Sequence, residues 1–333
     1  MLARARSTAS AALRVLPLAL TSLALMAACG AHRLKNRSAI ELQLPTLTLR
    51  DGRELPVLAL GVFRVPPGEH TYNAVTSALK LGYRHFDTAE GYHNELSVGR
   101  AIADSGIPRE ELWVTTKLSK MWRSNAVTYD VAMAELRASL KRLGMAYVDL
   151  YLIHTPADSE HRVAQWRALC DAKLMGLVRS IGVSDYLVAE LEEIRLAKLE
   201  MPAVLQIEVN PWLVQVRSAV LQYAKEWSIV VEAWGALGVG AKFDDPKLLE
   251  VASHYRDRSV ADVLLKWSLQ MGFVPLVTSQ SPGHQASNLA LAADPTGWVL
   301  QAEDLALIDE LKAEPFFTIG CDIIGEHGAE CIS

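Results

Sequence analysis

The sequence has few cysteines, and this scarcity excludes two classes of protein. Only four occur in 333 residues, and none of them forms a CxxC pair: Cys29, Cys170, Cys321 and Cys331. A small scaffold held together by disulfides needs a much higher density of cysteine. A structural zinc site takes paired cysteines at close spacing, so we expect the protein to work without a bound metal.

A strong excess of charge of either sign is also missing. The chain has 33 Lys and Arg against 38 Asp and Glu, which gives a net charge of −5. A nucleic-acid-binding surface is normally basic, so we expect no nucleic acid among the partners of this protein. Half of the residues are hydrophobic and 21% are charged. This composition is typical of a globular protein and excludes a disordered or fibrous one.

Acidic residues are absent before Glu41, where the composition differs from the rest of the chain. Three arginines lie within the first 14 residues, and residues 15–28 are almost wholly apolar. This run is shorter than the ~20 residues of a membrane span. A basic start, an apolar middle and small residues before Cys29 resemble a secretory signal peptide or a lipoprotein signal with a lipid anchor at Cys29.

Two other interpretations of this segment stay open. An organelle transit peptide is also rich in Arg and Ser and poor in acids, and a wrongly assigned start or an uncleaved anchor is the third alternative. We predict a targeting segment over 1–40, a catalytic domain over 41–315 and a C-terminal tail over 316–333. The protein is then secreted, lipoprotein-anchored or organellar if the leader is real, and cytoplasmic otherwise. We expect no membrane span in the mature domain.

After the leader, strand and helix patterns alternate. Short apolar runs predict eight strands, at 57–60, 84–86, 112–116, 148–153, 180–183, 204–209, 229–233 and 273–277. Apolar residues at three- and four-residue spacing predict helices between them, at 70–81, 94–105, 129–143, 160–175, 187–197, 216–227 and 259–270. Eight strand–helix units without a low-complexity linker predict an α/β fold, a single (β/α)8 TIM barrel.

Two glycine-containing segments refine this prediction. Residues 47–50 and 54–57 flank Asp51-Gly52, which predicts an N-terminal β-hairpin with a type I′ turn. A Rossmann domain should carry GxGxxG directly after its first strand, whereas the first strand here runs into Gly61-Val62-Phe63-Arg64. The glycines of 235–240 come late and have the wrong spacing, so we interpret that segment as a flexible loop.

Four polar residues stand where catalytic groups of a TIM barrel belong, at the C-terminal ends of strands. Asp87 closes the second predicted strand, Lys117 the third and His154 the fourth, while Tyr92 lies five residues after Asp87. Each residue alone has an ordinary structural interpretation, as a helix cap, a surface charge, a core histidine or simple packing. Together they form a chemical unit.

The unit suits the reduction of a carbonyl group. A tyrosine hydroxyl has an ordinary pKa of ~10, and a neighbouring ammonium lowers that pKa by favouring the phenolate. A carboxylate keeps the lysine charged and in place, and a histidine can orient the substrate oxygen. Such a tyrosine can protonate the alkoxide that forms as a carbonyl is reduced.

Residues 86–95, FDTAEGYHNE, resemble the signature DTAxxYxNE of the aldo-keto reductases. Further segments fit the same family, at 116–118, 152–154, 181–184 and 206–211, so the resemblance covers about 46–315. Residues 232–238 are similar to the bacterial diketogluconate-reductase-like branch. The resemblance implies hydride transfer from a nicotinamide cofactor to an aldehyde or ketone, so the expected partner is a small-molecule carbonyl substrate. It implies Tyr92 as the acid, Lys117 and Asp87 as its tuning pair, and His154 as the orienting group.

The resemblance also implies which residues hold the cofactor, NADP(H), with NAD(H) as an open alternative. Ser184, Asp185 and Gln206 match positions that bind the carboxamide, and Trp234 matches the ring that stacks on the nicotinamide. Asp185 stands where the family usually has Asn. An ionised carboxylate only accepts hydrogen bonds, so one of the two amide contacts is in doubt. The hairpin matches a plug at the bottom of the family's barrel.

The largest departure from the family lies at 278–288, where its pattern is KSxxPxRxxEN. The Lys and Arg that hold the 2′-phosphate of NADPH are replaced by Thr278 and His284, whereas Ser279 and Asn288 are kept. Charge-assisted contacts to phosphate are strong. We therefore expect a weakened preference for NADPH, unless other residues supply the positive charge.

The substrate pocket is the least defined part of the prediction. Phe63 stands at an aromatic pocket position and Trp122 lies in a following loop, and either residue could instead serve only packing. Pocket walls come from variable loops, so the sequence does not identify the carbonyl substrate. A second functional hypothesis is a nicotinamide-binding, redox-sensing or regulatory subunit with low turnover. The intact set of four catalytic residues favours the enzyme.

Overall fold

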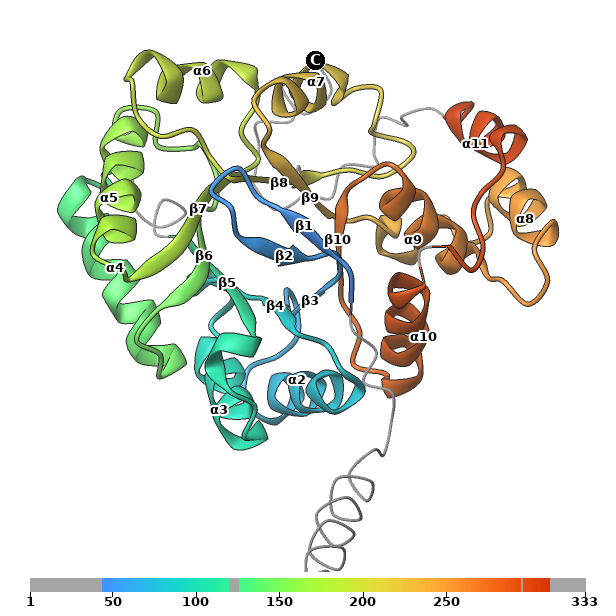
Figure 1. The fold of residues 1–333 in the computed structure, drawn as a ribbon, viewed down its shortest axis with the longest axis horizontal. Helices are drawn as coiled ribbons and strands as arrows, with labels where there is room; N and C mark the ends of the chain where they lie inside the picture. The colour runs from blue at the N-terminus through green and yellow to red at the C-terminus, as the bar shows by residue number, and fades with distance from the viewer. Residues whose placement is uncertain (1–43, 120–125, 295, 312–333) are drawn as a thin grey trace, which may run out of the picture. The chain divides into compact units, whose positions relative to one another are not determined.

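A computed structural model describes residues 44–119, 126–294 and 296–311 (Figure 1). The predicted targeting segment, Trp122 and the predicted tail lie outside these residues. Eight parallel strands form a closed barrel, with the order β10-β3-β4-β5-β6-β7-β8-β9. Their bounds are β3 Ala59–Gly61, β4 His85–Asp87, β5 Trp113–Leu118, β6 Val148–Ile153, β7 Val178–Ser184, β8 Val204–Glu208, β9 Val230–Trp234 and β10 Val274–Val277. The prediction of a (β/α)8 barrel is confirmed.

Helices surround the barrel on the outside (Figure 1). The predicted ones are α2 Glu69–Leu81, α3 Glu95–Ser105, α4 Tyr129–Leu143, α5 Arg162–Leu174, α6 Val188–Leu196, α7 Ser218–Glu226 and α9 Val260–Gln270. Sequence analysis missed α8 Pro246–Ser253, α10 Pro282–Ala293 and α11 Ala302–Asp309. Two of these begin with proline at the first helical position, where the missing N–H costs nothing, so a residue that usually ends a helix here starts one.

The strands are buried on both faces because side chains fill the barrel and helices cover it. All residues of β5, β6 and β8 are buried, which explains why most of the predicted strands are largely apolar and do not alternate between apolar and polar residues. Gly182 in β7 allows a close approach to β8, since a Cβ at this position would lie 2.5 Å from the carbonyl oxygen of Val204.

The predicted hairpin is present, with β1 Thr46–Thr48 antiparallel to β2 Glu54–Pro56. It lies in front of the barrel in Figure 1. Its Leu49 and Leu55 are buried in one apolar cluster with Trp113 and Leu150, so the hairpin covers the barrel interior. The predicted type I′ turn is wrong. Only Gly52 of the turn has a positive φ, of 80°, and the Leu49 amide donates to the Arg53 carbonyl across a three-residue loop.

The barrel is closed by the pairing of β10 with β3, through Leu276 with Ala59 and Val277 with Leu60. The C-terminal ends of all eight strands therefore meet at one end of the barrel. The segment interpreted as a flexible loop contains a turn of 3-10 helix at this end, Gly238–Gly240. Within the part of the chain that the structure describes, no helix combines the length and apolar character that crossing a membrane requires.

Candidate active site

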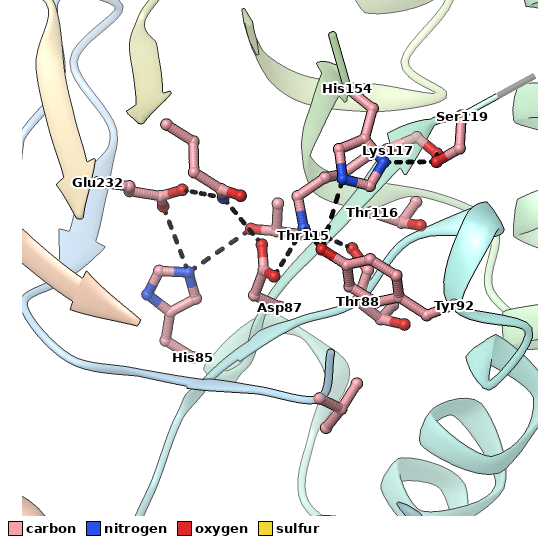
Figure 2. Close-up of polar contacts among 12 residues, drawn as sticks. His85, Asp87, Thr88, Tyr92, Thr115, Thr116, Lys117, Ser119, His154 and Glu232 are labelled. Atoms are coloured by element: carbon pink, nitrogen blue, oxygen red, sulfur yellow. Dashed lines mark hydrogen bonds and ion pairs between the residues drawn. The ribbon is translucent and has the colours of Figure 1, made fainter. Parts of the chain in front are cut away.

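The four residues predicted as catalytic meet at the C-terminal end of the barrel (Figure 2). The Nζ of Lys117 donates to Oδ1 of Asp87 at 2.6 Å and to the Thr88 carbonyl at 2.9 Å. It also donates to the Tyr92 hydroxyl at 3.3 Å. Tyr92 reaches this point because β4 is followed by a short 3-10 helix, η1 Glu90–Tyr92, which turns the ring toward the mouth of the barrel.

His154 lies on the other side of the tyrosine. Its Nε2 is 3.4 Å from the Tyr92 hydroxyl, and its Nδ1 is 2.5 Å from the Ser119 hydroxyl. Ser119 was missed by sequence analysis, because a serine one residue beyond a strand carries no signal of its own. Its hydroxyl can donate to Nδ1, which leaves Nε2 as the N–H that faces Tyr92.

Charge at the site is set by burial and by one strong ion pair. Burial lowers the pKa of Lys117, but the attraction of Asp87 and the contact with Tyr92 outweigh it, so the pKa is raised and the side chain is an ammonium. Burial raises the pKa of Tyr92 to about 12, although Lys117 acts in the opposite direction. The predicted lowering of that pKa is therefore wrong in its net sign, because desolvation exceeds the effect of the ammonium.

The histidine is neutral. Burial, together with the positive charge of Lys117, lowers the pKa of His154 well below its ordinary value. A neutral imidazole beside a protonated tyrosine can donate one hydrogen bond to a substrate oxygen without adding a second positive charge.

Behind Asp87 lies a second layer of polar side chains. The amide nitrogen of Gln206 donates to Oδ2 of Asp87 at 3.0 Å and to Oε2 of Glu232 at 2.8 Å. Gln206 is thus committed to holding two carboxyl groups, and its carbonyl oxygen is the atom it can offer to a ligand. Glu232 was missed by sequence analysis. The signal was a carboxyl group in the middle of an apolar strand, between Val231 and Ala233.

A cavity of about 1010 Å³ opens above these residues. It is lined by Tyr92 and His154, and by every predicted cofactor or pocket residue within the described chain: Phe63, Ser184, Asp185, Gln206, Trp234, Thr278, Ser279, His284 and Asn288. The centroid of the Phe63 ring lies 5.0 Å from that of Tyr92, so this aromatic side chain borders the predicted proton donor. One continuous space therefore joins the residues predicted as catalytic to the 278–288 segment.

Asp185 lies on the wall of this cavity, in contact with Trp234. It follows β7 in a left-handed conformation, with φ at 57°, and Oδ1 accepts a hydrogen bond from the Trp234 indole at 3.0 Å. Burial raises its pKa to about 6, although the indole contact acts in the opposite direction. The carboxyl group therefore orients the indole ring at a cost in desolvation.

Arg258 was not identified from the sequence, yet it lines the same cavity as Thr278 and His284. Its guanidinium lies 5.1 Å from the centroid of the Trp298 ring. It is a cation on the wall where the family's Lys and Arg are replaced. Over 44–119, 126–294 and 296–311, no group of three or more His, Cys, Asp or Glu side chains could hold a metal ion.

Comparison with known proteins shows which family this chain resembles. Residues 58–313 match the profile described as "Aldo/keto reductase family". An "Aldo-keto reductase" of Mycolicibacterium smegmatis is 42% identical over 269 residues, which cover 80% of this chain and 91% of that protein.

Two solved structures similar to this chain are also of aldo-keto reductases. A crystal structure of an aldo/keto reductase from Brucella melitensis has a TM-score of 0.72 at 34% identity and covers 81% of this chain and 100% of its own. A Bombyx mori aldo-keto reductase crystallised in complex with NADP has a TM-score of 0.71 at 32% identity, over 81% of this chain and 93% of its own.

Proposed function

We propose a role for each residue of the site, starting from the finding that the chain belongs to the aldo/keto reductase family and is an oxidoreductase that reduces aldehyde or ketone carbonyls with NAD(P)H. Tyr92 donates the proton to the carbonyl oxygen, and Lys117 with Asp87 tunes and positions it. His154 orients the carbonyl. The observation that carries the proposal is the position of the Tyr92 hydroxyl, 3.3 Å from Nζ of Lys117 and 3.4 Å from Nε2 of His154, on the cavity wall.

Tyr92 gives up a proton in the reaction and is left with a negative charge. As a carbonyl gains a hydride, its oxygen becomes an alkoxide, which takes the hydroxyl proton of Tyr92. The resulting phenolate lies beside the Lys117 ammonium, which stabilises it in a buried site where charge interactions are strong. Burial keeps the hydroxyl protonated until this moment, because it raises the pKa of Tyr92 to about 12.

The donors and acceptors of the cavity fit the carboxamide of a nicotinamide. That group has an N–H₂ that donates and a carbonyl that accepts. The carbonyl oxygen of Gln206 and the carboxyl group of Asp185 can accept, and the Ser184 hydroxyl can donate. A bound nicotinamide supplies the hydride, and Trp234 offers it an indole face whose edge is held by Asp185.

At the other end of the cavity, Thr278, Ser279, His284 and Asn288 would hold the adenosine phosphate. Arg258 supplies a permanent positive charge on the same wall. The cofactor we propose is NADP(H), and NAD(H) is also accepted. Arg258 would bind the 2′-phosphate in place of the replaced lysine and arginine. Phe63 borders the substrate side of the cavity.

The catalytic role of the tyrosine is tested by Tyr92→Phe. The ring remains and the proton is lost, so cofactor affinity should be unchanged in a fluorescence titration. Turnover with a panel of aldehydes should fall by about 100-fold or more, which is the scale of general acid catalysis. Near-normal turnover of this variant would refute the assignment. Unchanged low turnover in both proteins would instead favour the alternative of a regulatory, cofactor-binding subunit.

We further propose that residues 1–40 are a targeting segment, on the evidence of their composition alone. Secretory, lipoprotein and organellar routes differ in what they leave on the mature chain. Mass spectrometry of the protein from its native source would show a chain that starts at Cys29 and carries lipid, a chain cleaved elsewhere, or an intact leader. The last result would contradict the proposal.

A further inference from the structure

Glu232 lies one layer behind the catalytic residues, on β9, and its side chain is fully buried (Figure 2). Oε2 accepts a hydrogen bond from Gln206, which also holds Asp87. Oε1 has no hydrogen-bond partner in the described chain and lies 3.5 Å from Nε2 of His85, another fully buried group. A buried carboxyl oxygen that faces a ring nitrogen needs a proton between them.

The hydrogen bonds of His85 show that the proton cannot come from a neutral imidazole. Nδ1 lies 3.1 Å from the carbonyl oxygen of Pro56, which only accepts, so Nδ1 carries a hydrogen. In the neutral ring, Nε2 then bears a lone pair. The Thr115 hydroxyl, 3.5 Å from the same nitrogen, can rotate and does not supply a proton to Glu232. Two acceptors would repel each other, so either Glu232 or His85 holds an additional proton.

The surroundings place that proton on the carboxyl group. Burial lowers the pKa of His85 to about 3, although its bond to Pro56 acts in the opposite direction. Burial and the negative charge of Asp87 raise the pKa of Glu232 to about 8, although Gln206 and Lys117 lower it. Among the described residues, the charged or titratable side chains that act on Glu232 are His85 and Asp87 of β4 and Lys117 of β5, and Gln206 of β8 adds a neutral donor. At neutral pH the pair is a carboxylic acid and a neutral imidazole.

We propose that Glu232 is a positioning residue held as the neutral acid, its proton donated to Nε2 of His85, so that Asp87 alone is negative in the chain of contacts that reaches Lys117 and Tyr92. The inference rests on the proposed function, because it concerns the group that tunes Tyr92. Loss of the proton would put a second negative charge behind Asp87. That charge would make Tyr92 a weaker acid and would remove the restraint that His85 places on Glu232.

The protonation state can be measured without catalysis. In wild-type protein with isotope-labelled glutamate, infrared spectroscopy at pH 7 should show the carbonyl stretch of a protonated carboxyl group, which should titrate away with a midpoint near 8. In protein with labelled histidine, magnetic resonance should show that the ring of His85 is neutral and protonated at Nδ1. Absence of the carboxyl band, or a doubly protonated His85 at pH 7, would overturn the proposal.

The consequence for Tyr92 is tested by the pH profile of the single-turnover reduction rate. In the wild type the rate should fall by up to about tenfold between pH 7 and pH 9, one unit above the midpoint. Glu232→Gln keeps a donor for His85 and an acceptor for Gln206 but cannot ionise, so this alkaline fall should disappear. A variant that keeps the same fall would overturn the proposal.

Asp149→Asn is the matched control. Asp149 is also a buried carboxyl group with a raised pKa, but it lies at the opposite end of the barrel, on β6, paired with Arg109. This variant should keep the wild-type pH profile. If Glu232→Gln does not fold, the infrared titration of the wild type still decides the matter. Inactivity of the wild type with every carbonyl would defeat the proposed function and leave the spectroscopic result standing.

Discussion

Replacing Asp185 with Asn should stabilise the folded protein at neutral pH. The two side chains have the same shape, Asn tolerates the left-handed conformation at φ 57°, and its Oδ1 can still accept from the Trp234 indole. What changes is the charge. Burial raises the pKa of Asp185 from 3.8 to about 6, and each unit corresponds to 1.36 kcal/mol, so the ionised carboxyl group destabilises the fold by about 3 kcal/mol.

The sign of the pH dependence follows from where the proton is held more tightly. The folded chain keeps the proton up to pH of about 6, whereas the unfolded chain loses it near 3.8. The wild type therefore loses free energy of unfolding as the pH rises from about 4 to 6, and the loss is constant above that range. Asp185→Asn has no such loss. The variant should equal the wild type near pH 4 and exceed it by about 3 kcal/mol at pH 8.

Urea unfolding, followed by tryptophan fluorescence at several pH values between 4 and 8, measures this difference. Asp257→Asn is the matched control, because Asp257 has a similar left-handed conformation, with φ at 60°, but an exposed side chain. Because its side chain is exposed to solvent, Asp257→Asn should change the unfolding free energy little. A difference for Asp185→Asn that does not change with pH, or a variant less stable than the wild type at pH 8, would refute the reasoning.

Three further results are expected. Thr278→Lys with His284→Arg should tighten NADPH by roughly 100-fold or more, since each of the two charge-assisted contacts contributes about 1.5–3 kcal/mol, and should leave the affinity for NADH nearly unchanged in titrations. Gly182→Ala should lower the free energy of unfolding by about 1–3 kcal/mol in urea melts, because its Cβ would lie 2.5 Å from a backbone oxygen. Dialysis against a chelator should leave the reduction rate unchanged; a rate lost on chelation and restored by a metal would contradict this expectation.

Much of the fold follows from the sequence because a parallel barrel has a simple local signature. A strand buried on both faces is mostly apolar, and the run at 148–153, apolar except for Asp149, predicts the bounds of β6. Helices that begin with proline, such as α10, have a start that resembles a break. The turn at Gly52 depends on the φ of its neighbour, which the pair Asp-Gly does not determine.

That the four residues predicted as catalytic come together could be predicted because each lies at or just after the C-terminal end of a strand, and these ends meet at one end of a barrel. Glu232 and His85 could not, since their contact joins strands far apart in sequence and is defined by the lack of water around it. The direction of the pKa shift of Tyr92 could not be predicted for the same reason. A neighbouring lysine is visible in a sequence, but the extent of burial that outweighs it is not.

The pairing of β10 with β3 is the joint that closes the barrel, and we expect it to form late in folding. Every other strand pairs with its neighbour in sequence, whereas this joint brings together the two ends of the barrel chain, and the entropy of closing so long a loop delays its formation. Gly61 at the end of β3 and Thr278 after β10 both line the cavity. A cofactor bound there would contact both strands of this joint. Its binding energy would therefore also slow local opening of the barrel and protect the amides of these two strands from hydrogen exchange.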